Sequence, residues 1–146
     1  MTRHNGVGRR FRPLRSIRRR EVNPVPLIQE IGYSVKVGME EAHQRWLEKN
    51  EKRLADAHPA GTRYIGTYVV VFSTDKESGT YRSLVELDSY GAIDKMAAAS
   101  KDPKSKFGKL LREWTAFGDF DWAAPWSQGL YRSVVDATIW DPEGQS

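Results

Sequence analysis

The sequence predicts an α+β fold built in the order β-α-β-β-α-β. Residues 64–72 contain only β-branched, aromatic and glycine side chains, as expected of a buried strand. A polar turn that contains Gly79 leads to a second strand-like segment, and helical patterns precede and follow this pair. A chain of 146 residues is long enough for one such domain with its own core and too short for two.

The predicted elements cover the chain from residue 27 onward. They are a strand at 27–37, a helix at 39–57, strands at 63–73 and 80–87, helical segments at 90–99 and 102–117, and a last strand at 130–140. We therefore divide the chain into a basic, extended arm at 1–26, a folded domain at 27–141 and a polar tail at 142–146.

The first helix is marked at both ends. Glu40 and Glu41 lie in its first turn, where carboxylates interact favourably with the positive end of the helix dipole. Pro59 ends it, because proline has no amide hydrogen with which to continue the helix.

The second helical region has two predicted starts. Asp88 or Ser89 can cap the segment at 90–99, and Asp102, which is followed by proline, can cap the next one. Large apolar residues then recur at helical spacing: Phe107, Leu110, Leu111, Trp114 and Phe117.

This order of elements is that of a ferredoxin-like domain, a four-stranded antiparallel sheet with both helices on one face. Two helices can cover only one face, whereas the uncharged run at 64–72 requires cover on both. We therefore expect a second copy of the chain on the other face, which gives a two-fold homodimer, a dimeric α+β barrel.

The positive charge is concentrated in the first 20 residues. Eight of the 23 basic side chains are arginines of this stretch, which has no acidic residue, so the remainder carries 15 basic and 19 acidic side chains. Such an arm can bind an acidic protein surface, anionic lipid or nucleic acid. It can equally be a solvated tail, a segment that wraps over a neighbouring subunit, or the product of translation from an upstream start. Nucleic acid is disfavoured, because the body contains no recognisable nucleic-acid module.

Several classes of site are disfavoured by composition. The chain has no cysteine, and its three histidines have no spacing suited to a shared metal, so we predict neither a metal nor another cofactor. Nucleotide-binding and catalytic-triad motifs are absent as well. No apolar run approaches the roughly 20 residues of a membrane span, and no secretory signal is recognisable. We expect no membrane partner and a cytoplasmic location.

Four segments carry a resemblance to known proteins. They are VKVG after the first strand, the acidic helix EEAHQRWLEKNEKRL, the strand and helix start YRSLVELDSYGAIDKMAA, and the helix DPKSKFGKLLREW. In this order they resemble the dimeric α+β barrel superfamily, which includes antibiotic-biosynthesis-type monooxygenases, stress-responsive A/B barrel proteins, some polyketide cyclases and NIPSNAP-like proteins. The resemblance covers residues 27–141 and implies the fold. Members range from cofactor-free oxygenases and cyclases to proteins without known activity, so it does not specify a reaction.

The first helix presents one set of candidate site residues. One stripe of this helix, at 100° per residue, contains Met39, Trp46, Asn50, Leu54 and Ala57, with His43 at its edge. We predict that His43 and Asn50 are catalytic residues facing a cavity between helix and sheet, and that Trp46 binds the substrate. In the alternative, each polar group bonds to the backbone or to a neighbouring tyrosine.

Aromatic side chains give a second set. Their density suits a flat, largely apolar ligand, or alternatively an aromatic core and dimer interface. We predict catalytic hydroxyl groups at Tyr64 and Tyr68, and substrate-binding rings at Tyr33, Trp114, Phe117, Trp122 and Trp126. The segment at 118–125, in which two aspartates alternate with rings, can act as a lid or be packed rigidly.

Charged residues within the strands give a third set. Arg82 and Glu86 share one parity in the strand at 80–87, and Arg132 and Asp136 share one in the last strand. Cross-strand ion pairs explain this pattern. If they face the cavity instead, Arg82 and Arg132 can hold a carboxylate or enolate of the substrate.

Together these features predict a small dimeric enzyme resembling the cofactor-independent monooxygenases and cyclases. It would act on an aromatic or polyketide-like small molecule by orientation and acid/base catalysis, in a pocket between helices and sheet. The alternative is a non-catalytic ligand-binding or interaction protein whose arginine-rich arm engages an acidic partner or a neighbouring subunit.

Overall fold

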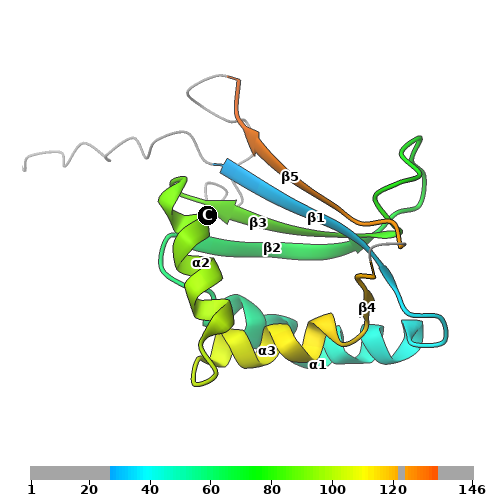
Figure 1. Cartoon of the computed structure of the whole chain (residues 1–146), viewed down its shortest axis with the longest axis horizontal. Coiled ribbons are helices and arrows are strands. Elements are labelled where there is room, and N and C mark those ends of the chain that lie inside the picture. Colours follow the sequence, from blue (N-terminus) through cyan, green and yellow to red (C-terminus); the bar gives the residue numbers. More distant parts are fainter. Residues whose placement is uncertain (1–26, 122–123, 135–146) are drawn as a thin grey trace, which may run out of the picture.

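The computed structural model describes residues 27–121 and 124–134. A curled antiparallel sheet lies over the helices, all of which are on one of its faces (Figure 1). This confirms the predicted α+β, ferredoxin-like fold. The elements are β1 (Leu27–Val35), α1 (Glu40–Ala57), β2 (Thr62–Val69), β3 (Tyr81–Leu87), α2 (Gly91–Lys101), α3 (Lys106–Thr115), β4 (Gly118–Asp119) and β5 (Ser127–Arg132).

Strand β1 lies in the middle of the sheet. On one side it pairs antiparallel with β3, from Leu27 opposite Leu87 to Tyr33 opposite Tyr81, and β3 pairs in turn with β2. On its other side β1 pairs with β5, and its end pairs with the two-residue β4. With β5 as the fourth strand, this is the predicted ferredoxin-like order.

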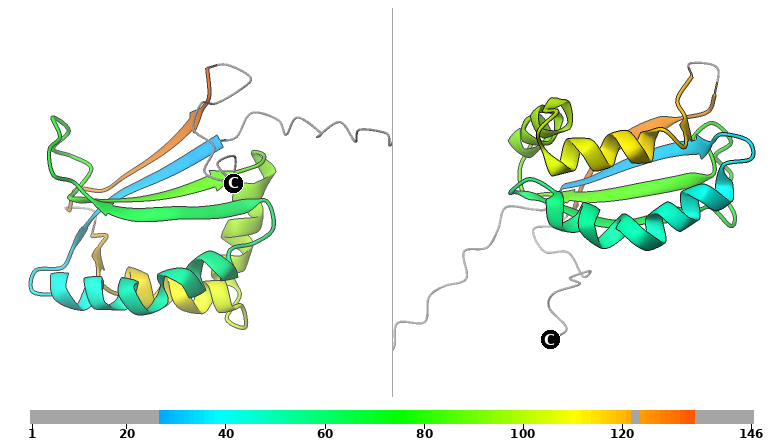
Figure 2. Two further views of the ribbon diagram at one scale, coloured as in Figure 1. Left: turned by 180° about the vertical axis from the view of Figure 1, so that it is seen from behind. Right: turned by 90° about the horizontal axis from the view of Figure 1, so that it is seen from below.

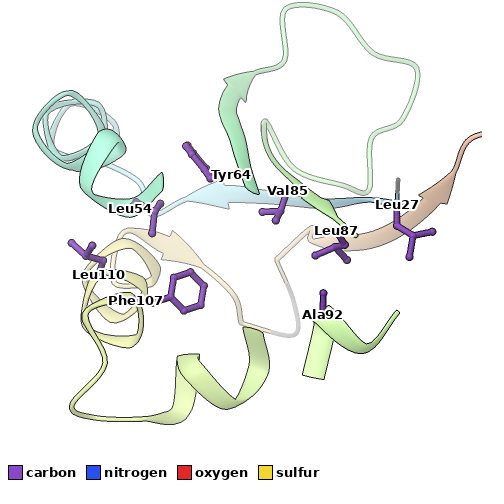
Figure 3. Close-up of a cluster of buried hydrophobic side chains, with 8 residues drawn as sticks. All are labelled: Leu27, Leu54, Tyr64, Val85, Leu87, Ala92, Phe107 and Leu110. Atoms are coloured by element: carbon purple, nitrogen blue, oxygen red, sulfur yellow. The ribbon is translucent and has the colours of Figure 1, made fainter. Parts of the chain in front are cut away.

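The helices form a second layer below the sheet. Helices α1 and α3 run side by side, and α2 stands at one end of the sheet (Figure 2). Between the layers lies a first core cluster of eight buried side chains, drawn in Figure 3: Leu27, Leu54, Tyr64, Val85, Leu87, Ala92, Phe107 and Leu110. A second cluster is centred on Tyr33, Val35 and Trp114.

Strand β2 is shorter than predicted and ends at Val69. The amide of Val70 still donates to the Thr80 carbonyl at 2.7 Å, but Val71 and Phe72 are 96% and 87% exposed. A bulge between Tyr64 and Gly66 interrupts the pairing with β3 and changes which residues face the helices. No helix or strand at 27–121 or 124–134 covers the outer face of the sheet (Figure 1). The homodimer, which we inferred from the uncharged residues 64–72, therefore stays a prediction.

The predicted helix caps are wrong in two places. Helix α3 is capped by Ser105, whose hydroxyl accepts from the Gly108 amide at 2.8 Å. Asp102 instead accepts from the Lys104 amide at 2.9 Å, a local turn that competes with helix formation. At α2 the N-cap is Tyr90, with no capping side-chain hydrogen bond.

The start of the last strand is described by the structure, whereas its predicted end at residue 140 is not. Strand β5 starts at Ser127, three residues earlier than predicted, because its pairing with β1 begins opposite Gly32. The arm, the tail, Trp122 and Asp136 lie outside the described residues.

The loop between β2 and β3 folds back onto the end of β1. Gly79 has a φ of +74°, and a Cβ atom there would lie 2.3 Å from the carbonyl carbon of Tyr33. Only glycine allows this approach. The guanidinium of Arg82 secures the loop by donating to the carbonyls of Ser78 and Gly79, each at 2.9 Å.

Candidate functional site

A cavity of about 230 Å³, which we call the inner cavity, lies between the sheet and the helices. Its sheet side is lined by Gln29, Ile31, Tyr64, Ser83, Val85 and Gln128. The helix side is mostly apolar and includes Leu54, Ile93, Met96, Phe107, Leu111 and Trp114. A cavity thus occurs in the layer where the sequence predicts a pocket.

Two buried polar atoms of the inner cavity have no hydrogen-bond partner among the described residues. They are Oε1 of Gln29 and Nε1 of Trp114, whose residues are 4% and 6% exposed. A buried polar group left unpaired costs roughly 1–3 kcal/mol. A bound molecule that offers a donor to Gln29 and an acceptor to Trp114 would remove both costs.

His58 supplies the cavity with a neutral imidazole. It follows the last residue of α1, and its Nδ1 lies 2.8 Å from the Leu54 carbonyl oxygen. A carbonyl can only accept, so Nδ1 carries the hydrogen and Nε2 keeps its lone pair. Burial lowers the pKa of His58, although the bond to Leu54 opposes this shift. At neutral pH Nε2 is therefore an unprotonated nitrogen able to accept a proton.

The rings around His58 hold its imidazole in place. Its ring packs edge-on against Phe107, with centroids 4.6 Å apart, and in a tilted arrangement against Tyr64, with centroids 5.7 Å apart. The Tyr64 hydroxyl lies 2.6 Å from Thr67 Oγ1 and donates to Glu51 Oε1 at 3.0 Å. Burial raises the pKa of Tyr64 well above its usual value, and the charge of Glu51 adds to this rise, whereas Thr67 opposes it. Tyr64, predicted as catalytic, therefore lines the cavity with its hydroxyl group protonated and bonded to Glu51 and Thr67.

His43 and Asn50, predicted as catalytic, do not line the inner cavity. His43 Nε2 lies 2.8 Å from the Tyr33 hydroxyl, and both residues are 1% exposed. Asn50 donates to the Trp46 carbonyl at 3.0 Å and accepts from Arg53 at 3.0 Å. The structure thus has the alternative arrangement, in which these polar groups are satisfied by a tyrosine, the backbone and their own helix.

Tyr33 and His43 belong to a filled aromatic cluster. The Tyr33 ring contacts those of Tyr81, Trp114 and Phe120, with centroids 4.8–5.8 Å apart. Burial raises the pKa of Tyr33 and lowers that of His43. The nearby Trp114 side chain partly opposes the rise in the pKa of Tyr33. Its Nε1 nevertheless forms no hydrogen bond with any described residue.

Two further predicted substrate-binding residues pack beside this cluster. Trp46 lies against both core clusters, and its Nε1 donates to Glu113 at 3.2 Å. Phe117 packs against the rings of Trp46 and His43. Neither lines the inner cavity.

The predicted arginines and Tyr68 lie away from the inner cavity. Arg82 alternates with Ser83, which lines the cavity, so it lies on the outer face of the sheet, where it is 3.9 Å from Glu30. Arg63 and Glu86 pair on the same face. Arg82 and Glu86 therefore take part in cross-strand ion pairs, as in the first interpretation of the charge pattern. Tyr68 lies opposite Arg82 in the register of β2 and β3 and is half exposed. Arg132 is exposed at the end of β5.

The predicted aromatic segment borders a second space, which we call the outer hollow. It has a volume of about 270 Å³ and shares Ile31, Leu111, Trp114 and Gln128 with the inner cavity. Phe120 and Trp126 complete its wall together with Thr115. Trp114 and Trp126 thus both line the outer hollow, whereas Trp122 lies outside the described residues.

Sequence reasoning missed Gln29, Ser83 and His58 as site residues. A signal existed for Gln29, which shares its strand parity with Leu27 and Tyr33 and so had to face the helices. For His58 the sequence offers no such signal, because the three histidines have no spacing suited to a shared metal. Among residues 27–121 and 124–134, no group of three or more metal-binding side chains is present. In the same part of the chain, no helix is long and apolar enough to cross a membrane.

Comparison with known proteins places the fold. A NIPSNAP-family protein from Agrobacterium tumefaciens superposes with a TM-score of 0.55 and 8% identity, over 82% of this chain and 92% of that protein. A NIPSNAP-like domain protein from Burkholderia xenovorans gives 0.54 and 11%, over 81% and 97%. This is the fold of the NIPSNAP proteins. The α+β, ferredoxin-like fold that the resemblance implies is thus confirmed.

SnoaB, a cofactor-independent oxygenase from Streptomyces nogalater, also matches, with a TM-score of 0.42 and 11% identity over 80% of this chain and 97% of that protein. That similarity is too distant to carry an argument about chemistry. No protein-family model and no curated protein matches the sequence.

Proposed function

We propose that the protein is an acid/base enzyme that binds a largely apolar molecule with an enolisable or phenolic oxygen in the inner cavity. The observation that carries this proposal is the His58 imidazole, whose Nδ1 bonds to the Leu54 carbonyl and whose Nε2 has no hydrogen-bond partner among the described residues, in a cavity with two unpaired polar atoms. The apolar walls and aromatic rings suit an aromatic or polyketide-like substrate.

In the proposed reaction His58 acts as the base. Its Nε2 takes a proton from the carbon beside a carbonyl group, and the electron pair of the broken C–H bond moves to the carbonyl oxygen to give an enolate. The Trp114 Nε1 hydrogen is available to bond that oxygen, and Gln29 can accept from a hydroxyl elsewhere on the substrate. The imidazolium then returns the proton to the same or another atom. An oxygenation by dioxygen, with the substrate anion as electron donor, would start from the same step.

The test follows solvent deuterium into 2-tetralone, an enolisable bicyclic ketone. The full chain in deuterium oxide is expected to catalyse exchange of the hydrogens beside the carbonyl, measured by proton NMR. His58→Gln should lower the catalysed rate at least about 100-fold, because a general base contributes about that factor or more. His43→Gln serves as the matched control, since that histidine lies outside the inner cavity.

The outcomes separate the enzyme from the alternative. Exchange that depends on His58 and not on His43 supports the proposal. If the ketone binds and no exchange occurs, the chain is a ligand-binding protein, as in the alternative prediction. Equal losses in both variants would mean that the histidines matter for folding alone.

A further inference from the structure

Trp114 stands between two spaces of different chemical character. The inner cavity contains the polar side chains of Gln29, His58, Tyr64 and Ser83, all of them at least half buried. The outer hollow adds only Thr115, Phe120 and Trp126 to the residues that the two spaces share. Polar recognition is therefore available in the inner cavity, and mainly apolar contact in the outer hollow.

Resting on the proposed function, we propose that the substrate is an uncharged molecule of two parts. Its oxygen-bearing ring occupies the inner cavity, and a second, apolar part, such as another ring, occupies the outer hollow against Trp126 and Phe120. The two spaces are adjacent, because they share four wall residues: Ile31, Leu111, Trp114 and Gln128.

The sizes of the two spaces fit one ring each. An apolar cavity of about 150 Å³ is enough to hold benzene. The inner cavity, at about 230 Å³, therefore accommodates one substituted ring, and the outer hollow, at about 270 Å³, accommodates a second.

The charge of the walls excludes ionic substrates. Among the described residues, no Asp, Glu, Lys or Arg lines either the inner cavity or the outer hollow. A carboxylate or phosphate in these spaces would lose its hydration without gaining a counter-ion, which is strongly unfavourable. Neutral ketones and phenols meet no such penalty.

The exposure of the Trp126 ring supports an apolar occupant of the outer hollow. This large ring is 50% exposed, whereas Phe120 beside it packs against Tyr33 and Trp114. A ligand that covers the Trp126 ring buries apolar area on both partners, which favours binding. Trp126 is thus a specificity-determining residue that favours extended substrates over single rings.

The experiment compares two ketones on the full chain by NMR titration. 4-Phenylcyclohexanone offers both parts, and cyclohexanone offers only the oxygen-bearing ring. We expect the extended ketone to bind at least about tenfold more tightly, because a second ring is buried. Trp126→Ala should remove most of this gain. Tyr90→Ala is the matched control, since Tyr90 is a 64% exposed ring that lines neither space.

The orientation is read from deuterium exchange of the bound extended ketone. If its oxygen-bearing ring lies in the inner cavity, the hydrogens beside the carbonyl exchange at a rate that depends on His58. Tight binding without such exchange, in a protein that exchanges 2-tetralone, would place the phenyl ring innermost and overturn the proposal.

Three other results have distinct meanings. Equal affinities for the two ketones would overturn the two-part substrate and leave the proposed function intact, provided that 2-tetralone still exchanges. An equal effect of Trp126→Ala and Tyr90→Ala would overturn the role of Trp126. Absence of both binding and 2-tetralone exchange would overturn the proposed function together with this inference.

Discussion

Helix α1 has a buried histidine, His43, in its first turn and is followed directly by a half-buried one, His58. The two imidazoles have different surroundings. His43 is enclosed by rings and bonded through Nε2 to Tyr33. His58 lines a cavity, and its Nε2 has no partner among the described residues. Burial lowers the pKa of both, so the titration shift alone does not distinguish them. The presence of space and an unused lone pair does.

The same contrast holds for the two core clusters around them. Around Tyr33 the layer between sheet and helix is filled by rings, whereas around Val85 and Ser83 part of it is open. A filled, satisfied region stabilises the fold, and an open region with unpaired polar atoms is available to a ligand. Trp114 belongs to both regions, because it packs on Tyr33 and lines the inner cavity.

Trp114→Ala is expected to have the largest effect, since it damages both regions. The ring is 6% exposed, and truncating a buried aromatic residue costs about 3–5 kcal/mol of unfolding free energy. Urea denaturation of the variant measures the loss. A cost below about 1 kcal/mol would contradict the packing described for Trp114.

A matched pair of valines tests which region is filled. Val35 lies in the filled cluster and Val85 lines the inner cavity, and both are strand residues less than 10% exposed. Val35→Phe should cost about 1–3 kcal/mol by overpacking. Val85→Phe should cost clearly less, because the added ring can enter the cavity, and it should weaken binding of 2-tetralone. Equal costs in thermal or urea unfolding would show that the two regions do not differ.

Tyr33→Phe tests the satisfied histidine. The change removes one hydroxyl and leaves His43 Nε2 buried without its partner, which should cost roughly 1–2 kcal/mol. Deuterium exchange of 2-tetralone should remain, since neither residue lines the inner cavity. A stable variant that loses exchange would move the chemistry to the Tyr33–His43 pair, of which the sequence analysis predicts only His43 as catalytic.

The pH dependence of stability is expected to be the smallest effect. The folded-state pKa values of His43 and His58 lie below the usual value of about 6.5, so the unfolded chain takes up protons first as the pH falls. Stability should therefore decline as the pH falls below about 6.5 and stop responding to these histidines below their folded-state pKa values. Urea midpoints in His43→Gln and His58→Gln should each depend less on pH between 7 and 5. Unchanged pH dependence in both variants would contradict the lowered pKa values.

The fold was predictable because its signals are local. Alternation in β1 and helical spacing from Phe107 to Trp114 place each element, and their order specifies the ferredoxin-like sheet. Capping was less predictable, since Asp102 and Ser105 are both good caps and only the chain path selects Ser105.

The layer that contains the inner cavity was predictable, whereas its lining residues were only partly so. Tyr64 and Trp114 do line the inner cavity, and Trp126 borders the outer hollow. Whether a polar side chain is satisfied depends on distant residues: the partner of His43 is Tyr33 on β1, ten positions away in sequence and on another element. For Asn50 the partners are on its own helix, but its neighbour Arg53 could equally have faced solvent. Sequence periodicity does not contain this information.

The role of His58 is tested most directly by a nitrogen-15 NMR titration of the histidine side chains with 2-tetralone. We expect free His58 to be a neutral tautomer with its hydrogen on Nδ1, and its Nε2 resonance to shift on addition of the ketone. The resonances of His43 should change little, because its Nε2 already bonds to Tyr33. Shifts at His43 without shifts at His58 would contradict the assignment of the site to the inner cavity.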